Sequence, residues 1–131
     1  MQNPVMKIDR LDHLVLTVSN IEVTCKFYST VLGLEIVSFG SGRRAMAFGS
    51  QKINLHEAGR EYLPHAQHPT PGSADLCFIS SILLSSVLDH LRACAVPILE
   101  GPVERTGAAG KIRSVYIRDP DQNLIEISEY I

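Results

Sequence analysis

The chain has 131 residues, of which 45% are hydrophobic, which is enough to fill the core of one ordinary domain or of two small halves sharing a core. A formal net charge of −2, a pI near 6.2 and scattered cations exclude a nucleic-acid-binding stripe. Three cysteines, an odd number, indicate free thiols in a reducing compartment, and no apolar run approaches a secretory core or a bilayer span, so we expect a soluble cytoplasmic protein without a membrane partner.

The first half of the chain predicts a strand, a helix and three further strands. A strand over 11–18 leads to a helix over about 20–32, with Asn20 as its N-cap and Gly33 as its stop. The glycines after this helix indicate hairpin turns. The expected strands are near 34–39, 43–49 and 52–57.

The second half repeats this order after a proline-rich surface linker over 58–72. Its helix is expected over about 83–94, ending at Val96-Pro97. The expected strands are 74–80, 96–100, 112–118 and 123–129. The pattern therefore predicts one domain of two modules, about 8–57 and about 73–130, each with the order βαβββ.

Four potential metal ligands lie on the wetter faces of four predicted strands: His13, His56, Asp75 and Glu126. Strand side chains alternate, so the residues next to His13 and Glu126 form the apolar faces that pack under the helices. Asp75 lies 62 residues after His13 and Glu126 lies 70 after His56, which indicates eight extra residues in module two. The loop Gly101 to Lys111 is where we expect them. Two such modules placed edge to edge would leave a trough lined by these four side chains.

Several stretches resemble the vicinal oxygen chelate superfamily, which includes glyoxalase I, fosfomycin-resistance proteins, bleomycin-binding proteins and extradiol dioxygenases. The similar stretches are DHLVLTV at 12–18, FYSTVLGL at 27–34, KINLHE at 52–57 and DPDQNLIE at 119–126. Together they span most of the chain. Within the superfamily, the chain is most similar to small single-domain proteins of the glyoxalase domain-containing protein 5 type.

The resemblance implies an α+β fold in which paired βαβββ modules form a curved mixed sheet with the helices outside. It also implies one divalent metal ion held by the first and last strands of each module, here His13, His56, Asp75 and Glu126. Nickel, cobalt or zinc is favoured, and iron or manganese is possible. The family's glyoxalases carry a carboxylate where His56 stands and an imidazole where Asp75 stands. Asp75 is shorter than His, so a contact through water would leave a set of two histidines and one carboxylate, which also suits Fe(II) oxygen chemistry.

The resemblance further implies a lyase or isomerase that acts on a small carbonyl compound, or on its hemithioacetal with a thiol such as glutathione, through a metal-stabilised enediolate. We expect Glu126 to be the catalytic base, with Asp75 as the alternative. Tyr116 and Arg113 are candidate substrate-binding residues. Other cations that can hold an anion at the trough mouth are Arg43, Arg44, Arg105 and Lys111.

Two other kinds of function fit the same residues. One is an Fe(II) dioxygenase or a thiol transferase of the fosfomycin type, and the other is a metal-free module that sequesters a ligand, as the bleomycin-binding relatives do. Retention of His13, His56 and Glu126 together favours an enzyme. A homodimer is expected, because members of this superfamily often build one site from two chains and association would cover the sheet edges.

Overall fold

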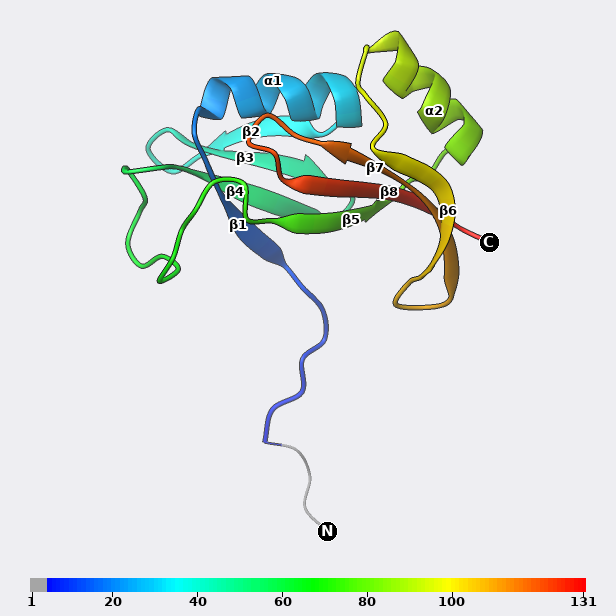
Figure 1. Ribbon diagram of the computed structural model, residues 1–131. Coiled ribbons are helices and arrows are strands. Elements are labelled where there is room, and N and C mark those ends of the chain that lie inside the picture. Colours follow the sequence, from blue (N-terminus) through cyan, green and yellow to red (C-terminus); the bar gives the residue numbers. More distant parts are fainter. Residues whose placement is uncertain (1–4) are drawn as a thin grey trace.

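The computed structural model describes residues 5–131, in which one order of elements occurs twice (Figure 1). Module one contains β1 (His13–Val18), α1 (Ile21–Leu32), β2 (Glu35–Phe39), β3 (Arg43–Phe48) and β4 (Gln51–Glu57). Module two contains β5 (Asp75–Ile79), α2 (Leu84–Ala93), β6 (Glu100–Thr106), β7 (Lys111–Arg118) and β8 (Leu124–Tyr130). The α+β fold of paired βαβββ modules is confirmed.

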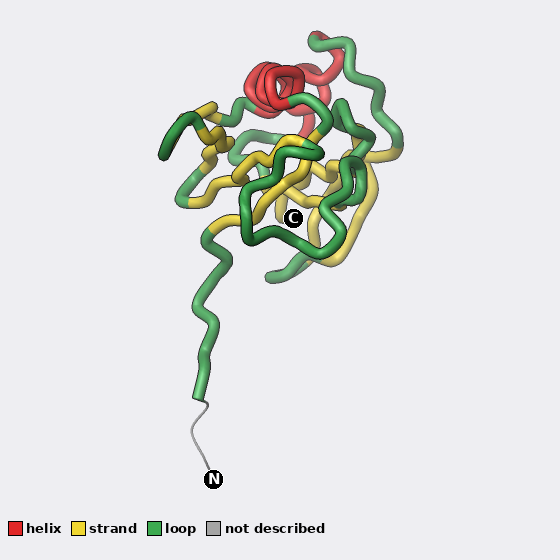
Figure 2. Tube along the Cα trace, turned by 90° about the vertical axis from the view of Figure 1, so that its left-hand side faces the viewer, coloured by secondary structure: helices red, strands yellow, loops and turns green. Residues whose placement is uncertain are grey.

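Each module forms its own four-stranded mixed sheet, in the orders β1-β4-β3-β2 and β5-β8-β7-β6. The first and last strands of each module pair in parallel, and the other pairs are antiparallel. Both helices lie on the same side of the strands, above them in Figure 1 and again in the turned view of Figure 2. The opposite faces of the sheets are therefore left for a site. Within residues 5–131 no helix is long and apolar enough to cross a bilayer.

One hydrophobic core joins the two modules under the helices. Apolar side chains from the inward faces of β1, β4, β7 and β8 pack in a single cluster with buried residues of α1 and α2. Burial alternates along the strands, so that Ile125 and Ile127 are buried while Glu126 between them lies on the other face, half-buried. The core therefore determines which side chains face away from the helices.

Both ends of α1 follow from the local sequence. The side chain of Asn20 accepts a hydrogen bond from the backbone N–H of Val23 at 3.1 Å and satisfies one of the free donors of the first turn. Gly33 adopts the left-handed conformation, with φ of 70°, that ends the helix. The caps predicted at these two residues are confirmed.

The loop 119–123, between β7 and β8, connects the modules. Tyr28 of α1 donates a hydrogen bond from its hydroxyl to Asp119 Oδ2 at 2.6 Å, and both residues are buried. Asp119 Oδ1 accepts from the backbone N–H of Asn123 at 3.0 Å, while Asn123 Oδ1 accepts from the backbone N–H of Ala74 at 2.8 Å. The DPDQN motif therefore has a structural role: its hydrogen bonds form a clasp that holds the loop 119–123 to α1 and to the start of β5.

The sixth strand differs from the prediction of a strand over 96–100. Residues 96–99 contain no strand, and β6 instead spans Glu100–Thr106, so the loop expected over 101–111 shrinks to 107–110. The pairing of β6 with β7 is irregular between Glu100 and Val103, where Gly101 and Pro102 interrupt the ladder. Glycine and proline are typical of loops, so this part of the sequence predicts a loop. In the structure they lie at a bulge, and pairing with β7 keeps them in the sheet.

Candidate functional site

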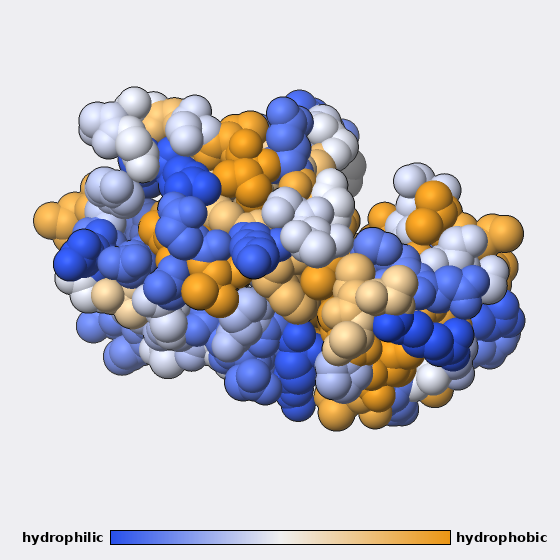
Figure 3. All heavy atoms as spheres, turned by 90° about the horizontal axis from the view of Figure 1, so that it is seen from above, coloured by the Kyte–Doolittle hydropathy of each residue, from blue (hydrophilic) through white to orange (hydrophobic). Residues whose placement is uncertain are grey.

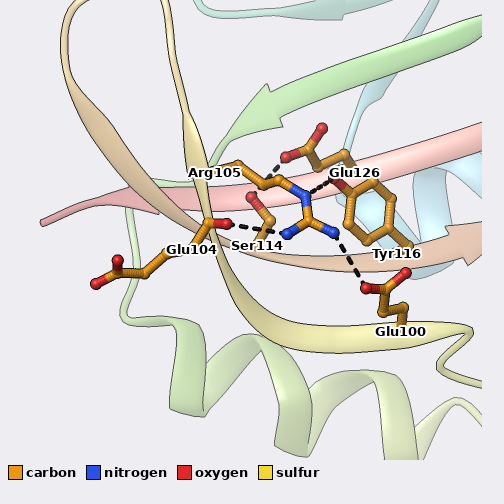
Figure 4. Close-up of polar contacts among 6 residues, drawn as sticks. All are labelled: Glu100, Glu104, Arg105, Ser114, Tyr116 and Glu126. Atoms are coloured by element: carbon orange, nitrogen blue, oxygen red, sulfur yellow. Dashed lines mark hydrogen bonds and ion pairs between the residues drawn. The ribbon is translucent and has the colours of Figure 1, made fainter.

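Glu126 lies in the middle of β8, on the face that points away from the helices. Its Oε2 accepts a hydrogen bond from the Ser114 hydroxyl at 2.5 Å (Figure 4). The Ser128 hydroxyl lies 3.4 Å from the same oxygen. Ser114 and Ser128 are fully buried, and their hydroxyl oxygens lie 2.6 Å apart. These contacts hold one carboxylate oxygen of Glu126 and leave Oε1 without a direct restraint from them.

Tyr116 and Arg105 lie beside Glu126. Tyr116 is the direct neighbour of Glu126 across the β7–β8 pair, and its hydroxyl accepts from Arg105 Nε at 3.0 Å. Burial and Glu126 raise the pKa of Tyr116 against the opposing effect of Arg105. The phenol therefore stays protonated.

These side chains line a cavity of about 390 Å³, which also contains Cys77. Cys77 is the partner of Glu126 in the parallel β5–β8 pair, and burial raises the pKa of its thiol, with a further contribution from Glu126. A neutral thiol is a poor nucleophile and a poor metal ligand. Glu126 is the carboxylate in the lining of this cavity.

A larger cavity, of about 630 Å³, lies on the helix side of the molecule. It is lined by apolar residues such as Phe48, Phe78 and Leu91. Figure 3, which views the molecule from the helix side, shows apolar surface among the polar residues there. Among residues 5–131, its lining contains one ionisable side chain, His90, whose Nε2 contacts the carbonyl oxygen of Val31 at 2.9 Å. The larger cavity has no carboxylate and contains none of the predicted site residues, so we place the site at Glu126.

The pairing of β1 with β4 separates the two predicted histidine ligands. His13 lies opposite Lys52, whereas His56 lies opposite Thr17, four residues farther along the parallel pair. At a rise of about 3.3 Å per residue, the two histidines differ by about 13 Å along the sheet. One metal ion cannot bridge that span, so the register does not unite His13 with His56.

The register instead makes Asn54 the counterpart of Glu126. Asp75 starts β5 and Glu126 lies opposite the residue two positions later, just as His13 starts β1 and Asn54 lies opposite Val15. Asn54 is only 6% exposed, and its Oδ1 is buried without a hydrogen-bond partner among the described residues. A buried, unpaired amide oxygen is costly unless a ligand satisfies it. Asn54 was not among the residues predicted from the sequence, because an asparagine next to a histidine in KINLHE gives no signal of its own.

The remaining predicted site residues fall into two groups. His13 is exposed, and its Nδ1 lies 2.8 Å from Asp12 Oδ2, which orients the ring in the way that neighbouring carboxylates orient metal-binding histidines. Asp75 is exposed at the start of β5. Arg113 lies on the opposite face of β7 from Tyr116, 4.0 Å from Glu129, so it is turned away from the cavity. Arg105, one of the other cations considered, lies there instead.

Within residues 5–131, no group of three or more His, Cys, Asp or Glu side chains is placed to hold one metal ion. Three predicted ligands are divided between two places in the chain, His13 on module one and Asp75 with Glu126 on module two, and the register adds Asn54 to His13. We call these pairs half-site one and half-site two. A single chain does not join them.

His56 belongs to a separate cluster on module one. Its Nε2 lies 3.5 Å from a terminal nitrogen of Arg43, and its ring makes an edge-on contact with Tyr62 of the linker at 5.4 Å between centroids. Burial and the Arg43 guanidinium lower the pKa of His56. His56 is therefore neutral and covered by the linker.

The fold and these residues can be compared with known proteins. The family model described as "Glyoxalase/Bleomycin resistance protein/Dioxygenase superfamily" matches residues 10–127. The chain belongs to this superfamily. This superfamily includes both enzymes and binding proteins, so membership does not establish an activity for this chain.

Two relatives are similar over most of the superfamily domain. "Virulence protein STM3117" from Salmonella typhimurium is 58% identical over 96% of this chain and 88% of that protein, and its crystal structure superposes with a TM-score of 0.95, covering 96% of this chain and 100% of that one. "Glyoxalase domain-containing protein RDO1" from Mycosarcoma maydis is 50% identical over 95% of this chain and 70% of that protein.

A solved lactoylglutathione lyase from Agrobacterium tumefaciens shares the fold, with a TM-score of 0.72, 23% identity and coverage of 94% of this chain and 95% of that chain. At this identity the likeness concerns the fold alone. The assignment of an activity therefore depends on the residues of the two half-sites.

Proposed function

We propose that the protein is a metal-dependent lyase or isomerase of the glyoxalase I type, acting on a small carbonyl compound or its hemithioacetal, with each site assembled from two chains of a homodimer. Half-site one of one subunit would face half-site two of the other. The observation that carries this proposal is that two equivalent positions of the modules hold potential ligands: an Asn54 oxygen with no partner among residues 5–131, and a Glu126 carboxylate restrained by Ser114.

The donors of the two half-sites fit a divalent cation. His13 offers Nε2 because Asp12 occupies Nδ1, and Asn54 offers a buried oxygen that has no other partner. Asp75 and Glu126 supply carboxylates with the same stagger along the other sheet. One imidazole and three oxygen donors match the ligands that divalent metals use in proteins. A bound ion would supply positive charge to the oxygens of the substrate.

Glu126 would act as the base. Its Oε2 is held by Ser114, so Oε1 can take a proton from the carbon next to a carbonyl and return it to the adjacent carbon, which gives an isomerisation without any other reactant. Tyr116 keeps its proton and can donate it in a hydrogen bond to a substrate oxygen. Arg105 holds the Tyr116 hydroxyl in place.

A thiol transferase of the fosfomycin type is the second candidate. The proposed ligand set contains Asn54 where the sequence had predicted His56, so it has one imidazole and three oxygen donors. A set this rich in oxygen suits manganese better than zinc or nickel. The same exchange removes the two-histidine, one-carboxylate set on which the dioxygenase alternative depended. Metal analysis of protein purified without added metal separates the two: nickel, cobalt or zinc supports the isomerase and manganese supports the transferase.

The direct test is turnover by Glu126→Gln. With the hemithioacetal of methylglyoxal and glutathione as substrate, we expect this variant to lose at least about a hundredfold in kcat, because a general base contributes a factor of that order. Glu104→Gln is the matched control, since Glu104 points away from the cluster (Figure 4) and should keep the wild-type rate. Full activity in Glu126→Gln would remove Glu126 from the chemistry.

A further inference from the structure

We propose that Arg43, His56 and Tyr62 form a subsite that binds the oxyanion of a small ligand, a carboxylate or a phosphate. The subsite lies on the same face of module one as Asn54, because His56 follows Asn54 by two residues in β4. The proposal rests on the proposed function only in taking this face as the ligand-binding face. It adds that the ligand is an anion.

The hydrogen atoms in this cluster can be assigned from its contacts. A guanidinium has no acceptor, so the Nε2 atom of His56 that faces Arg43 must be the acceptor. The proton of the neutral ring is therefore on Nδ1. His56 is 2% exposed, and its Nδ1 is buried with no partner among residues 5–131. The ring thus holds an unused N–H donor.

Arg43 holds a second unused donor. Its Nε is buried without a hydrogen-bond partner, and no acidic side chain in the described chain lies within ion-pair distance of it. Its guanidinium is packed against the rings of Phe39 and Tyr62, at 5.1 and 4.3 Å. The nearby Glu61 carboxylate accepts from the backbone N–H of Gly59 instead. A cation fixed between aromatic rings and lacking a counter-charge is arranged to receive an anion.

The linker residue Tyr62 packs on both Arg43 and His56. The linker has no regular secondary structure here, and Tyr62 is 41% exposed. Movement of this part of the linker would uncover the two donors without breaking a strand or a helix. The neighbouring cation Lys52, whose Nζ lies 4.0 Å from the Phe39 ring, adds positive charge to this face.

Calorimetric titration with pyruvate, inorganic phosphate and uncharged methyl pyruvate tests the proposal. We expect saturable binding of pyruvate, phosphate or both, no binding of methyl pyruvate, and a loss of about tenfold or more in affinity in Arg43→Gln, from the loss of a charged hydrogen bond. Binding of pyruvate alone identifies a carboxylate ligand, and binding of phosphate alone a phosphate ligand. Arg44→Gln is the matched control, because Arg44 lies on the other face of β3 and pairs with Glu22.

A second measurement does not depend on a variant that folds. In wild-type protein, the imidazole nitrogen resonances of His56 should shift on anion binding. Absence of saturable binding to both anions, equal binding of methyl pyruvate, an equal loss in Arg44→Gln, or binding that leaves the His56 resonances unchanged would each overturn the proposal. Anion binding should persist in Glu126→Gln, so failure of the catalytic proposal would be seen separately as turnover in that variant.

Discussion

At the scale of single residues, register rather than residue type decides which side chains can share a ligand. His56 is the stronger metal ligand by chemistry, but it lies about 13 Å along the sheet from His13, whereas Asn54 lies about 7 Å away. The separations between His13 and Asp75 and between His56 and Glu126 indicated eight extra residues in module two, which were expected in one loop. In the structure the extra residues are spread over several connections and longer strands. The separations therefore could not distinguish Asn54 from His56 as the counterpart of Glu126.

The neutral, buried His56 predicts a pH dependence of stability. The folded protein holds the pKa of His56 below its usual value of about 6.5, so the unfolded chain takes up a proton first as the pH falls. This group therefore lowers the free energy of unfolding below about pH 6.5. Urea denaturation from pH 7.5 to 5.5 should show a steeper loss of stability in wild type than in His56→Gln. Parallel curves for the two proteins would contradict a lowered pKa.

At the scale of elements, the order and type of most strands and both helices could be predicted, because apolar residues alternate with polar ones along much of β7 and β8 and α1 carries clear caps. The start of β6 could not, since Gly101 and Pro102 disfavour a strand in isolation and only the pairing with β7 retains them. The face of Arg113 follows from alternation along β7, so the sequence already contained the signal that separates it from Tyr116.

Gly101 should be essential for the position of β6. A Cβ atom there would lie 2.4 Å from the carbonyl oxygen of Ser114 and 2.9 Å from the Cα of Val115, and its φ of +111° disfavours other residues. We expect Gly101→Ala to destabilise the fold by about 3 kcal/mol or more, measured by urea denaturation. Gly110→Ala, where φ is +147° but no atom lies within 4 Å, isolates the backbone effect and should cost less. Equal losses would show that the contact with β7 is unimportant.

The clasp between α1 and the loop 119–123 gives a second stability prediction. Tyr28→Phe removes one of the two donors to Asp119 Oδ2, the other being the Asn123 side chain at 2.8 Å. The loss should be about 1 to 3 kcal/mol in the free energy of unfolding, because a buried carboxylate becomes less well satisfied. Tyr130→Phe, which removes an exposed hydroxyl, should change stability by less than about 0.5 kcal/mol. Similar effects of both substitutions would argue against a buried clasp.

At the scale of the whole molecule, the two half-sites differ in charge. The exposed face of module one carries His13, Arg43 and Lys52, with Glu35 as its acid, whereas that of module two carries Asp75, Glu100 and Glu126 with Arg105 and Arg118. Faces of opposite charge favour the meeting of module one of one chain with module two of another. This complementarity supports a dimer with two equivalent shared sites.

Purified heterodimers test this arrangement most directly. Two chains with different affinity tags are co-expressed, one carrying His13→Ala and the other Glu126→Gln, and bound metal and hemithioacetal turnover are measured per dimer. Shared sites predict one intact site, and hence about half the wild-type values, although each parent homodimer is inactive. A heterodimer of wild type with the double variant should then be inactive. The reverse pattern, an inactive first heterodimer and a half-active second one, would show that each site lies within one chain and contradict the account.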